Sequence, residues 1–544
     1  MPWTSGYEAV EVGGTTLHRL AFERAAQAGD RPALIEGLLG YVVSYGTLAS
    51  RVERVAAGLA ERGFGVGDVL ALWAPNVVQW AGVALGAMAA GGAVTGINPG
   101  YTERELKGQL ADSGASVLVT VPPLAATALS AASGARAWEV VVLGGPGGEI
   151  GGATSVYELI GGDGPFPESG ADPDAVALLP YSSGTTGLPK GVMLTHSNIV
   201  TSVRQVLSGL RVTERDTMLA VAPFFHVMGF VVNLAVPLAA GARVVTMSRF
   251  EVGEFFALIE RHGVTVLVVP PPVMALLAHY PLADAHDLSS LEMIVSGGAP
   301  LGADLQRAVA ERFPKASVGQ GWGLTETAVG ATMPERGIGT VPGTVGRVMP
   351  STELRVVDPD TGCDLGAGER GELLVRGPQV MKGYLNRPDA TAEILDADGW
   401  LATGDRGYVD EDGNVFVVDR LKDLIKVSAY QVAPAELEAL LVAHPRVADA
   451  AVVGRPDERH GEVPVAAVVP RGMAGEVDAE GIMAWVAERV APHKRLRAVW
   501  FVDEIPRTPT GKLLRRLLTE RGRQNPLRAG DQGRRHAREP QSRV

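Results

Sequence analysis

A ten-residue segment of small polar residues, Ser182–Gly191, carries the clearest chemical signal in this sequence. It reads Ser-Ser-Gly-Thr-Thr-Gly-Leu-Pro-Lys-Gly and follows the apolar stretch Ala175–Leu179. Glycines let the backbone close around phosphate oxygens, hydroxyls donate hydrogen bonds to them, and Lys190 adds a positive charge. The segment therefore predicts a polyphosphate-binding loop, and the alternative is a polar surface turn. Because Pro189 precedes the lysine and Gly191 follows it, the loop lacks the Gly-Lys-Ser/Thr ending of kinases and GTPases.

Four further segments combine polar side chains with glycines. Two of them, Pro223–Gly229 and Ser296–Pro300, follow expected strands, and the others are Gln320–Thr327 and Thr403–Asp405. Ligands of α/β proteins bind at the carboxyl ends of strands, so the first two are candidate binding segments. A histidine or carboxylate in one such segment, taken alone, more often has a structural role.

The elements that must position these segments alternate along the chain. Short β-branched runs, typical of buried strands, are separated by stretches with helical periodicity. This alternation predicts an α/β fold in which two mostly parallel sheets are covered by helices. The expected strands are Val69–Trp73, Val117–Val121, Val140–Leu143, Thr217–Val221, Ala242–Thr246, Val264–Val269 and Met293–Val295. The expected helices are Leu48–Arg62, Thr102–Ser113, Val252–Arg261 and Leu305–Arg312.

The apolar stretch Trp80–Ile97 is expected to be a buried helix followed by a buried strand. It is interrupted at Gly91-Gly92 and is shorter than the roughly 20 residues that a membrane span needs. No membrane span is therefore expected.

The pattern changes after about Gly343, where short strands separated by Asp/Gly turns predict a small antiparallel, barrel-like β region. Its expected strands are Leu354–Val357, Gly371–Arg376, Tyr408–Val409 and Val415–Val418. Beyond Arg420, helices and strands fill about a hundred residues, which is enough for a small α+β domain. Its expected elements are Pro434–Ala443, Val447–Val453, Val463–Val469, Ala479–Val490 and Ala498–Val502.

These patterns predict three parts of the chain. A large N-terminal domain is expected over residues 1–419 and a small α+β domain over 420–520. Residues 521–544 are rich in Arg, Gly, Gln and Pro, and we expect them to form a disordered basic tail.

Composition limits the class of protein. The net charge of −12 argues against nucleic acid as a partner, because phosphate backbones attract clustered positive charge. The single cysteine, Cys363, allows no intrachain disulfide and no multi-cysteine metal site. The N-terminal residues show no charged segment followed by an apolar core, as a secretory signal would. The expected location is the cytoplasm.

Taken together and in this order, the segments resemble the adenylate-forming superfamily of acyl-CoA synthetases, peptide-synthetase adenylation domains and firefly-type luciferases. The resemblance is greatest to 4-coumarate:CoA ligases and their bacterial relatives, and it covers about Thr16 to Arg516. The motifs that carry it are Ser182–Gly191, Gly321–Thr327, Thr403–Asp405, Asp419–Lys422 and Pro509–Lys512.

The resemblance implies a two-step reaction with ATP, Mg²⁺ and coenzyme A. A carboxylate attacks the α-phosphate of ATP, which gives an acyl-adenylate and pyrophosphate, and the thiol of coenzyme A then displaces AMP. Little covalent chemistry falls to the protein, so we expect positioning and charge neutralisation to dominate.

The same resemblance implies the nucleotide site. Glu326 would be a hard oxygen ligand for Mg²⁺, and Thr325 would bind the α-phosphate. Trp322 would lie against adenine, where the family usually carries Tyr or Phe, and Asp405 would bind the ribose together with Arg420. The implied nucleotide-binding residues are Ser182, Ser183, Gly184, Thr185, Thr186, Lys190, Gly321, Trp322, Gly323, Asp405, Arg420, Lys426 and Gln431.

Catalysis would depend on a mobile C-terminal lid. Lys512 would bridge the substrate carboxylate and the α-phosphate, offsetting their repulsion. After adenylation the lid would rotate about a hinge at Lys422, so that Lys426 and Gln431 replace Lys512 at the site. The implied catalytic residues are Lys512, Thr325, Glu326 and His226.

One departure from the family pattern concerns coenzyme A. Family ligases often carry Lys-Gly-Phe or Ser-Gly-Tyr after the hinge, whereas this chain reads Ser428-Ala429-Tyr430. Ala429 adds a methyl group beside the pantetheine path, and Ser428 replaces a basic residue that Arg249 could substitute for. Coenzyme A is the expected acceptor, with Arg249, Ser428 and Ala429 as its contacts, and a separate acyl carrier protein is the alternative.

An acyl pocket is also implied. Plant coumarate ligases carry a tyrosine and a serine at the positions of Met228 and Val232, and both residues are apolar here. A phenolic hydroxyl left unpaired would cost about 1–3 kcal/mol. We therefore expect a cinnamate-like or other aryl acid, or a medium-chain fatty acid, rather than 4-coumarate. The implied pocket residues are His226, Met228, Phe230, Val232, Gly297, Gly298, Gly321, Val329, Gly330 and Met333.

Other classes fit less well. No residue selects the oxygen chemistry of a luciferase. A non-catalytic relative is disfavoured because the charged motif residues Lys190, Glu326, Asp405, Arg420 and Lys512 are all present. The expected partners are small molecules (a carboxylic acid, ATP and coenzyme A), and the expected state is a monomer or homodimer.

Overall fold

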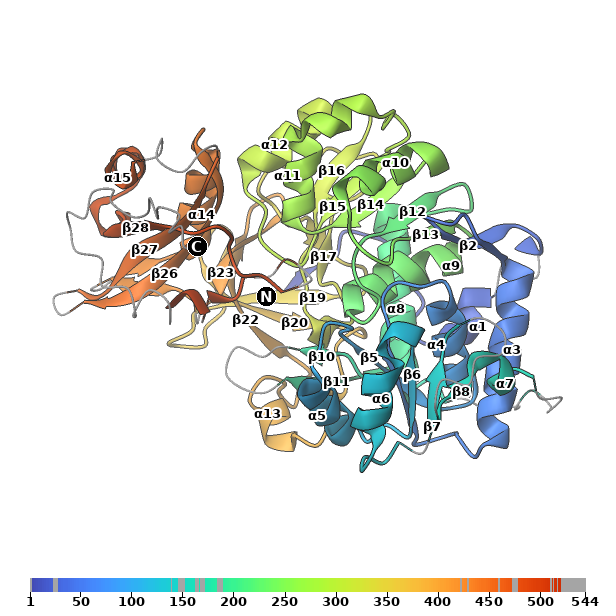
Figure 1. Ribbon diagram of the computed structural model, residues 1–544. Coiled ribbons are helices and arrows are strands. Elements are labelled where there is room, and N and C mark those ends of the chain that lie inside the picture. Colours follow the sequence, from blue (N-terminus) through green and yellow to red (C-terminus); the bar gives the residue numbers. More distant parts are fainter. Residues whose placement is uncertain are drawn as a thin grey trace, which may run out of the picture. The chain divides into compact units, whose positions relative to one another are not determined.

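The chain folds into two units, Met1–Val417 and Val418–Val544, in a computed structural model (Figure 1). We describe each unit by itself. The structure describes residues 2–22, 28–137, 139–144, 152–161, 166, 172–182, 189–420, 423–427, 430–457, 460–471, 478–508, 511, 513–515 and 517–519. No helix among them is both long and apolar enough to cross a lipid bilayer.

The first sheet of the large unit is built around four parallel strands whose residues are almost all buried. These central strands are β5 (Ala93–Ile97), β4 (Val69–Trp73), β6 (Val117–Thr120) and β7 (Glu139–Val142). The full order is β10-β11-β9-β5-β4-β6-β7-β8, and β21 pairs with β11. The outer strands are β8 (Thr154–Ser155), β9 (Val176–Leu178), β10 (Tyr181–Ser182), β11 (Lys190–Thr195) and β21 (Gly383–Tyr384).

The second sheet has the order β16-β15-β14-β12-β13-β2-β3. All neighbours in it are parallel except the hairpin formed by β2 and β3. The strands are β2 (Pro32–Glu36), β3 (Val42–Ser44), β12 (Thr217–Ala220), β13 (Arg243–Thr246), β14 (Val266–Val269), β15 (Met293–Ser296) and β16 (Ser317–Gln320). The two sheets with their helices confirm the predicted α/β fold.

Helices cover these sheets, and local signals determine several of their ends. Helix α5 begins at a capping box in which Thr102 and Glu105 exchange hydrogen bonds, and it ends at Gly114 with a φ of 65°. Helix α3 begins earlier than expected because Ser44 caps it by accepting from Thr47 N. The longer helices are α3 (Tyr45–Glu61), α4 (Gln79–Ala89), α5 (Glu103–Ser113), α8 (His196–Leu210), α10 (Val252–His262), α11 (Pro271–His279) and α12 (Ala303–Arg312). The shorter ones are α1 (Leu17–Phe22), α6 (Ala125–Ala132), α7 (Val156–Leu159), α9 (Val236–Ala240) and α13 (Pro388–Ala392).

The stretch Trp80–Ile97 contains all of α4 except its first residue and the whole of β5, as predicted. Trp80 is completely buried and packs against Phe224 and Phe230, with ring centroids 6.0 and 5.7 Å away. Burial of this apolar surface stabilises the core of the large unit.

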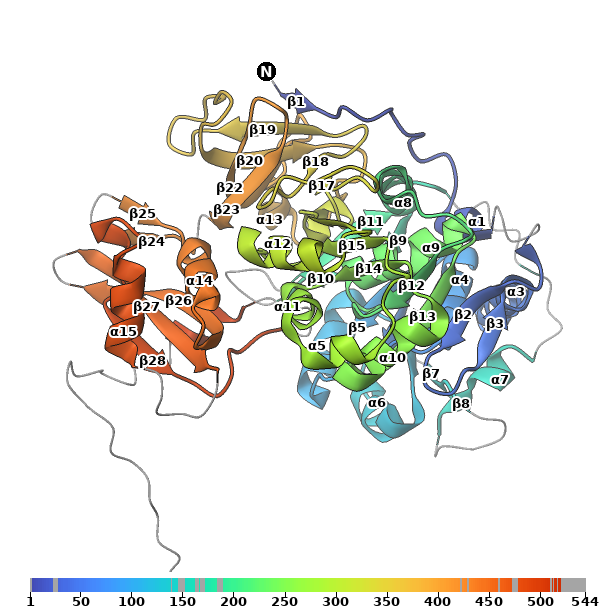
Figure 2. The same ribbon diagram turned by 90° about the horizontal axis from the view of Figure 1, so that it is seen from above.

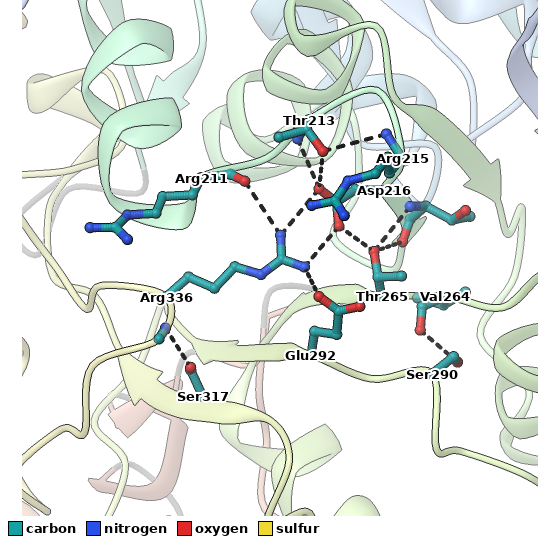
Figure 3. A network of polar contacts seen from close by, with 12 residues as sticks. Arg211, Thr213, Arg215, Asp216, Val264, Thr265, Ser290, Glu292, Ser317 and Arg336 are labelled. Atoms are coloured by element: carbon teal, nitrogen blue, oxygen red, sulfur yellow. Dashed lines mark hydrogen bonds and ion pairs between the residues drawn. The ribbon is translucent and has the colours of Figure 1, made fainter.

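A network of polar contacts joins the amino ends of the second sheet (Figure 3). Asp216, directly before β12, accepts two hydrogen bonds from Arg336, at 3.0 and 3.1 Å. It also accepts one from Thr265, directly before β14, at 2.7 Å. Arg336 forms a further ion pair with Glu292, directly before β15. The network therefore links three neighbouring strands at the edge opposite to their carboxyl ends.

The last part of the large unit is a five-stranded sheet with the order β1-β19-β20-β22-β23, whose final strand continues past Val417 into the C-terminal unit (Figure 2). Strands β1, β19, β20 and β22 pair antiparallel in this order, as the sequence predicts for this region. The strands are β1 (Trp3–Thr4), β19 (Glu353–Val357), β20 (Gly371–Arg376), β22 (Leu401–Val409) and β23 (Val415–Arg420). A short hairpin of β17 (Thr332–Met333) and β18 (Arg347–Val348) lies nearby in the sequence.

In the C-terminal unit, helices α14 and α15 lie on one face of a sheet (Figures 1 and 2). Its strand order is β25-β24-β27-β26, and β28 pairs parallel with β27. The strands are β24 (Ile425–Val427), β25 (Tyr430–Val432), β26 (Val447–Asp457), β27 (Gly461–Pro470) and β28 (Ala498–Phe501), and the helices are α14 (Pro434–Ala443) and α15 (Ala479–Ala487). This unit is the small α+β domain of the predicted fold.

Candidate active site

Three of the polar segments singled out above follow neighbouring or nearby parallel strands of the second sheet. Pro223–Gly229 comes after β12, Ser296–Pro300 begins at the end of β15, and the Gly321–Thr327 segment follows β16. Carboxyl ends of parallel strands meet at one edge of a sheet, which is where α/β proteins bind ligands.

Trp322 and Asp405 are held together by a side-chain hydrogen bond. The indole nitrogen of Trp322 donates to Asp405 Oδ2 at 2.8 Å. Asp405 lies in β22 and is 4% exposed, whereas Trp322 lies just beyond β16. Two backbone hydrogen bonds between Trp322 and Thr332 keep the indole in place. The contact joins a flat aromatic ring to a carboxylate from a distant part of the chain.

Glu326, Tyr384 and Lys190 form a second group. Glu326 lies in a short 3-10 helix, Thr325–Thr327, and its Oε1 accepts a hydrogen bond from the Tyr384 hydroxyl at 2.7 Å. The Lys190 ammonium lies 4.8 Å from the centroid of the Tyr384 ring. A cation and a carboxylate thus share one aromatic neighbour.

The hairpin of β10 and β11 positions the start and end of the predicted phosphate loop. Ser182 and Lys190 are opposite one another in this hairpin. The Ser182 hydroxyl oxygen is buried and has no hydrogen bond with any residue in the described part of the chain. The predicted phosphate-binding residues Ser183, Gly184, Thr185 and Thr186 lie outside the described residues.

The segment that carries Trp322 and Glu326 is tightly folded. A Cβ added to Gly323 would lie 2.3 Å from the Val329 carbonyl oxygen, so only glycine fits there. Ala328 and Val329 have φ angles of 47° and 119°, which are strained for non-glycine residues. Such strain is common where a backbone must present side chains at a functional site.

A π-helix, Met228–Ala235, carries the predicted acyl-pocket residues Met228, Phe230 and Val232, all of which are buried. Helices of this type are rare and are frequently found at functional sites. The Met228 sulfur lies 3.2 Å from the place that a Cβ on Gly297 would occupy. Met228 and Gly297 are therefore direct neighbours. His226 Nδ1 accepts a hydrogen bond from Met228 N at 3.3 Å, and Gly298 has a φ of 81°.

Other predicted pocket residues contact different neighbours. The Phe230 ring packs on Trp80, and the Met333 sulfur lies within 2.4 Å of where a Cβ on Gly209 would lie. A Cβ added to Gly330 would likewise lie 2.6 Å from the Met349 sulfur.

Arg249, a predicted coenzyme A contact, is well exposed. It forms an ion pair with Glu251 at 3.0 Å.

A second carboxylate lies close to Asp405. Burial raises the pKa of Glu372 above its ordinary value, and the negative charge of Asp405 raises it further. The Gly404 N–H, which donates to Glu372 Oε1 at 3.1 Å, partly opposes this. Glu372 and Asp405 therefore place two carboxyl groups at this corner of the site, and both groups can accept hydrogen bonds from hydroxyl donors.

The donor set fits Mg²⁺ only in company with ATP. No three His, Cys, Asp or Glu side chains gather as a metal site among the residues that the structure describes. Mg²⁺ is commonly held by one or two carboxylates plus substrate phosphates, and the buried Glu326 suits that arrangement.

In the C-terminal unit, Asp419 organises the start of the predicted lid. It accepts hydrogen bonds from Arg420 N at 2.8 Å and from Ala435 N at 2.9 Å. Burial raises the pKa of Asp419 to about 6, although Arg515 acts in the opposite direction. Lys426 is exposed on β24, opposite Gln431 on β25. The predicted residues Lys422, Ser428, Ala429 and Lys512 lie outside the described residues.

Two features of the site were not anticipated from the sequence. These are the role of Tyr384 and the direct bond from Trp322 to Asp405. The sequence carries no chemical signal for Tyr384, and the φ of 145° at the preceding Gly383 is seen only in the structure. The bond from Trp322 could have been suspected because, unlike Phe, Trp carries a ring donor.

Comparison with known proteins places this arrangement in a family. The model of the AMP-binding enzymes matches residues 21–385, and the model of their C-terminal domain matches residues 436–512. The chain belongs to the AMP-binding enzyme family, and its membership confirms the predicted adenylate-forming class.

Individual relatives narrow the comparison. The chain is 45% identical to 4-coumarate–CoA ligase 5 of Oryza sativa subsp. japonica, covering 92% of this chain and 93% of the relative. Among solved structures, ATP-bound MatB from Rhodopseudomonas palustris superimposes with a TM-score of 0.84 at 31% identity, over 93% of this chain and 99% of that one. An anthranilate CoA ligase, AuaEII, in complex with anthranoyl-AMP gives a TM-score of 0.87 at 27% identity, over 95% and 98% of the two chains.

Proposed function

We propose that this AMP-forming acid–thiol ligase joins an aryl carboxylic acid of the cinnamate class to coenzyme A. ATP and coenzyme A are its co-substrates, and Mg²⁺ accompanies ATP as is usual in the family. An acyl carrier protein is the less favoured acceptor, because the similar proteins are named as CoA ligases.

One observation carries the proposal. The large unit holds two groups of side chains, Lys190 and Glu326 around Tyr384, and Asp405 against Trp322. The short segment Gly321–Thr327 supplies one member of each group, Glu326 and Trp322. The chemistry of the set matches a nucleoside triphosphate. Lys190 suits phosphate oxygens, Asp405 suits ribose hydroxyls and the Trp322 face suits a purine.

The first step needs positioning and charge neutralisation. A carboxylate oxygen of the acid bonds to the α-phosphorus of ATP as the bond to pyrophosphate breaks. Asp405 and Arg420 hold the ribose, Thr325 holds the α-phosphate, and Lys512 brings an ammonium group between the two reacting anions. With ATP bound, Mg²⁺ would neutralise phosphate charge, with Glu326 as its ligand.

In the second step the thiol sulfur bonds to the acyl carbon, the bond from that carbon to AMP breaks, and the thiol proton passes to solvent. The C-terminal unit rotates about Lys422 between the steps, exchanging Lys512 for Lys426 and Gln431. Coenzyme A would then lie beside Ser428 and Ala429.

The proposed acid follows from the π-helix. Met228 and Val232 are buried and apolar, so they offer no hydrogen bond to a phenolic hydroxyl. The names of the relatives favour an aryl acid over a fatty acid. A cinnamate-type acid without a required ring hydroxyl satisfies both observations.

The remaining assignments concern the setting. The proposed location is the cytoplasm, with which the single cysteine agrees, and the proposed state is a monomer or homodimer.

Pyrophosphate exchange into ATP tests the proposal. Cinnamate, 4-coumarate, benzoate, octanoate and malonate would each be supplied without coenzyme A, and products formed with coenzyme A would be identified by mass. We expect cinnamate to support the fastest exchange and to give one thioester per AMP. A preference for 4-coumarate of about tenfold would overturn the proposed acid. Exchange with no aryl acid would overturn the proposed function.

A further inference from the structure

Tyr384 contacts both charged side chains that the proposed function assigns to the phosphates and the metal. Its hydroxyl donates to Glu326 Oε1 at 2.7 Å, and its ring faces the Lys190 ammonium at 4.8 Å. Tyr384 and Glu326 are each only 8% exposed. One buried side chain therefore connects a cation and a carboxylate from separate segments.

Backbone pairing keeps Tyr384 in this position. Its strand, β21, pairs with β11, which begins at Lys190, and Leu385 N donates to Gly191 O at 2.8 Å. On the other side, Met381 N donates to Glu326 O at 2.8 Å. The segment around Tyr384 thus ties the strand that carries the lysine to the short helix that carries the glutamate.

We propose that Tyr384 is a positioning residue, which sets the Glu326 carboxylate and the Lys190 ammonium at the spacing that a triphosphate and its Mg²⁺ require. The proposal rests on the roles that the proposed function gives to Glu326 and Lys190. Tyr384 acts through these two side chains.

The two contacts act in different ways. The hydrogen bond limits rotation of the Glu326 carboxylate, and it leaves further lone pairs on both oxygens for a cation. A phenol is neutral, so it orients Glu326 without cancelling its charge. The negative face of the ring attracts the lysine ammonium and restricts where the flexible side chain can lie.

Two substitutions separate these contacts. Tyr384→Phe keeps the ring beside Lys190 and removes the hydroxyl, whereas Tyr384→Leu removes both. Tyr45→Phe is a matched control, because the buried Tyr45 hydroxyl donates to Ala242 O at 2.7 Å and lies in α3, outside the site.

Isothermal titration of ATP into the full-length protein, with Mg²⁺ and with a chelator, measures the effect without turnover. The measured quantity is the ratio of the ATP affinity with Mg²⁺ to the affinity with a chelator. We expect this ratio to be about five- to tenfold smaller in Tyr384→Phe than in the native protein. Binding without Mg²⁺ should change less than about twofold. Tyr384→Leu should weaken binding under both conditions, because Lys190 also loses its neighbour. Tyr45→Phe should lower thermal stability and leave both affinities unchanged.

The outcomes distinguish this inference from the proposed function. Unchanged Mg²⁺ dependence in Tyr384→Phe would overturn the inference. The variant Glu326→Gln then shows whether the metal role that the proposed function gives to Glu326 also fails. If Glu326→Gln removes the Mg²⁺ dependence while Tyr384→Phe keeps it, the positioning role fails and the proposed function stands. If Glu326→Gln also keeps it, the metal role of Glu326 fails and the inference fails with it.

Discussion

The Trp322 indole N–H donates a hydrogen bond to Asp405 Oδ2 across 2.8 Å, joining the segment after β16 to strand β22. Asp405 is almost fully buried, so its orientation depends on such donors. In the proposed function, Trp322 therefore does more than offer a flat face to adenine. It also orients the carboxylate that receives the ribose hydroxyls.

Trp322→Phe tests this double role because it keeps an aromatic face and removes the donor. We expect KM for ATP to rise about fivefold with a smaller change in kcat, as the loss of one hydrogen bond implies. With 3′-deoxy-ATP, which offers one ribose hydroxyl fewer, the rise in KM caused by Trp322→Phe should be smaller. Trp73→Phe is the control, since the Trp73 indole donates to Asn98 O at 2.9 Å away from the motif segments. An equal rise with both nucleotides would contradict the ribose assignment.

Gly297→Ala tests the proposed wall of the acyl pocket. The added methyl group would lie 3.2 Å from the Met228 sulfur, so either the methionine moves or the space between them shrinks. We expect kcat/KM for ring-substituted cinnamates to fall about tenfold, while cinnamate is less affected. The double variant Gly297→Ala/Met228→Ala should regain activity with the larger acids. Failure of this rescue, with equal losses for all acids, would place Gly297 outside the pocket.

Asp216→Asn tests the network at the opposite edge of the second sheet. Breaking a buried ion pair costs about 3–5 kcal/mol, and the Asp216 and Arg336 side chains are only 4% and 13% exposed. Urea unfolding at neutral pH should show this loss. Asp304→Asn, which breaks the exposed pair with Arg307, should cost less than about 1 kcal/mol. Similar losses in both variants would contradict the account.

The same network predicts a pH dependence. Burial acts to raise the pKa of Asp216, but hydrogen bonds from Arg336, Thr265 and Thr213 outweigh it, and the net pKa lies below its ordinary value. A lowered folded-state pKa contributes stability above the unfolded-state pKa, and this contribution is lost as the pH falls through the folded-state value. The stability gap between the native protein and Asp216→Asn should therefore narrow in acid.

The contribution of Asp419 to stability depends on pH in the opposite direction. Burial raises its pKa to about 6, so its contribution favours folding at low pH and is lost as the pH rises through about 6. We expect the α14 peptide, Pro434–Ala443, to lose hydrogen-exchange protection over this range relative to Asp419→Asn. Comparing the two proteins at each pH cancels the intrinsic exchange rate. Glu436→Gln, on the same helix, is the control and should behave like the native protein. If Asp419→Asn shows the same pH profile of protection as the native protein, the assignment is refuted.

Much of the fold could be predicted because its strands are continuous apolar runs between polar turns. The bounds of Val69–Trp73 and Pro434–Ala443 agree with the expected ones. The hairpin of β2 and β3 was not expected, because its tip exposes apolar residues such as Leu39 and shows no clear alternation. The π-helix at Met228 could not be predicted, because its eight residues are nearly all apolar and all buried, so no periodic pattern distinguishes it from an α-helix.

The site could be predicted residue by residue where motifs carry the chemistry, as for Glu326 and Asp405. Tyr384 could not, because its role arises from the pairing of β21 with β11, which are distant in sequence. An isolated Gly-Tyr pair carries no chemical signal until that pairing places its ring beside Lys190.

The two half-reactions of Lys512→Ala test the central claim most directly. Pyrophosphate exchange reports formation of the acyl-adenylate, and supply of cinnamoyl-adenylate with coenzyme A reports thioester formation alone. The account predicts that exchange falls at least about a hundredfold, because the cation between the reacting anions is gone, while thioester formation stays within about threefold of the native rate. Equal loss of both steps would contradict it.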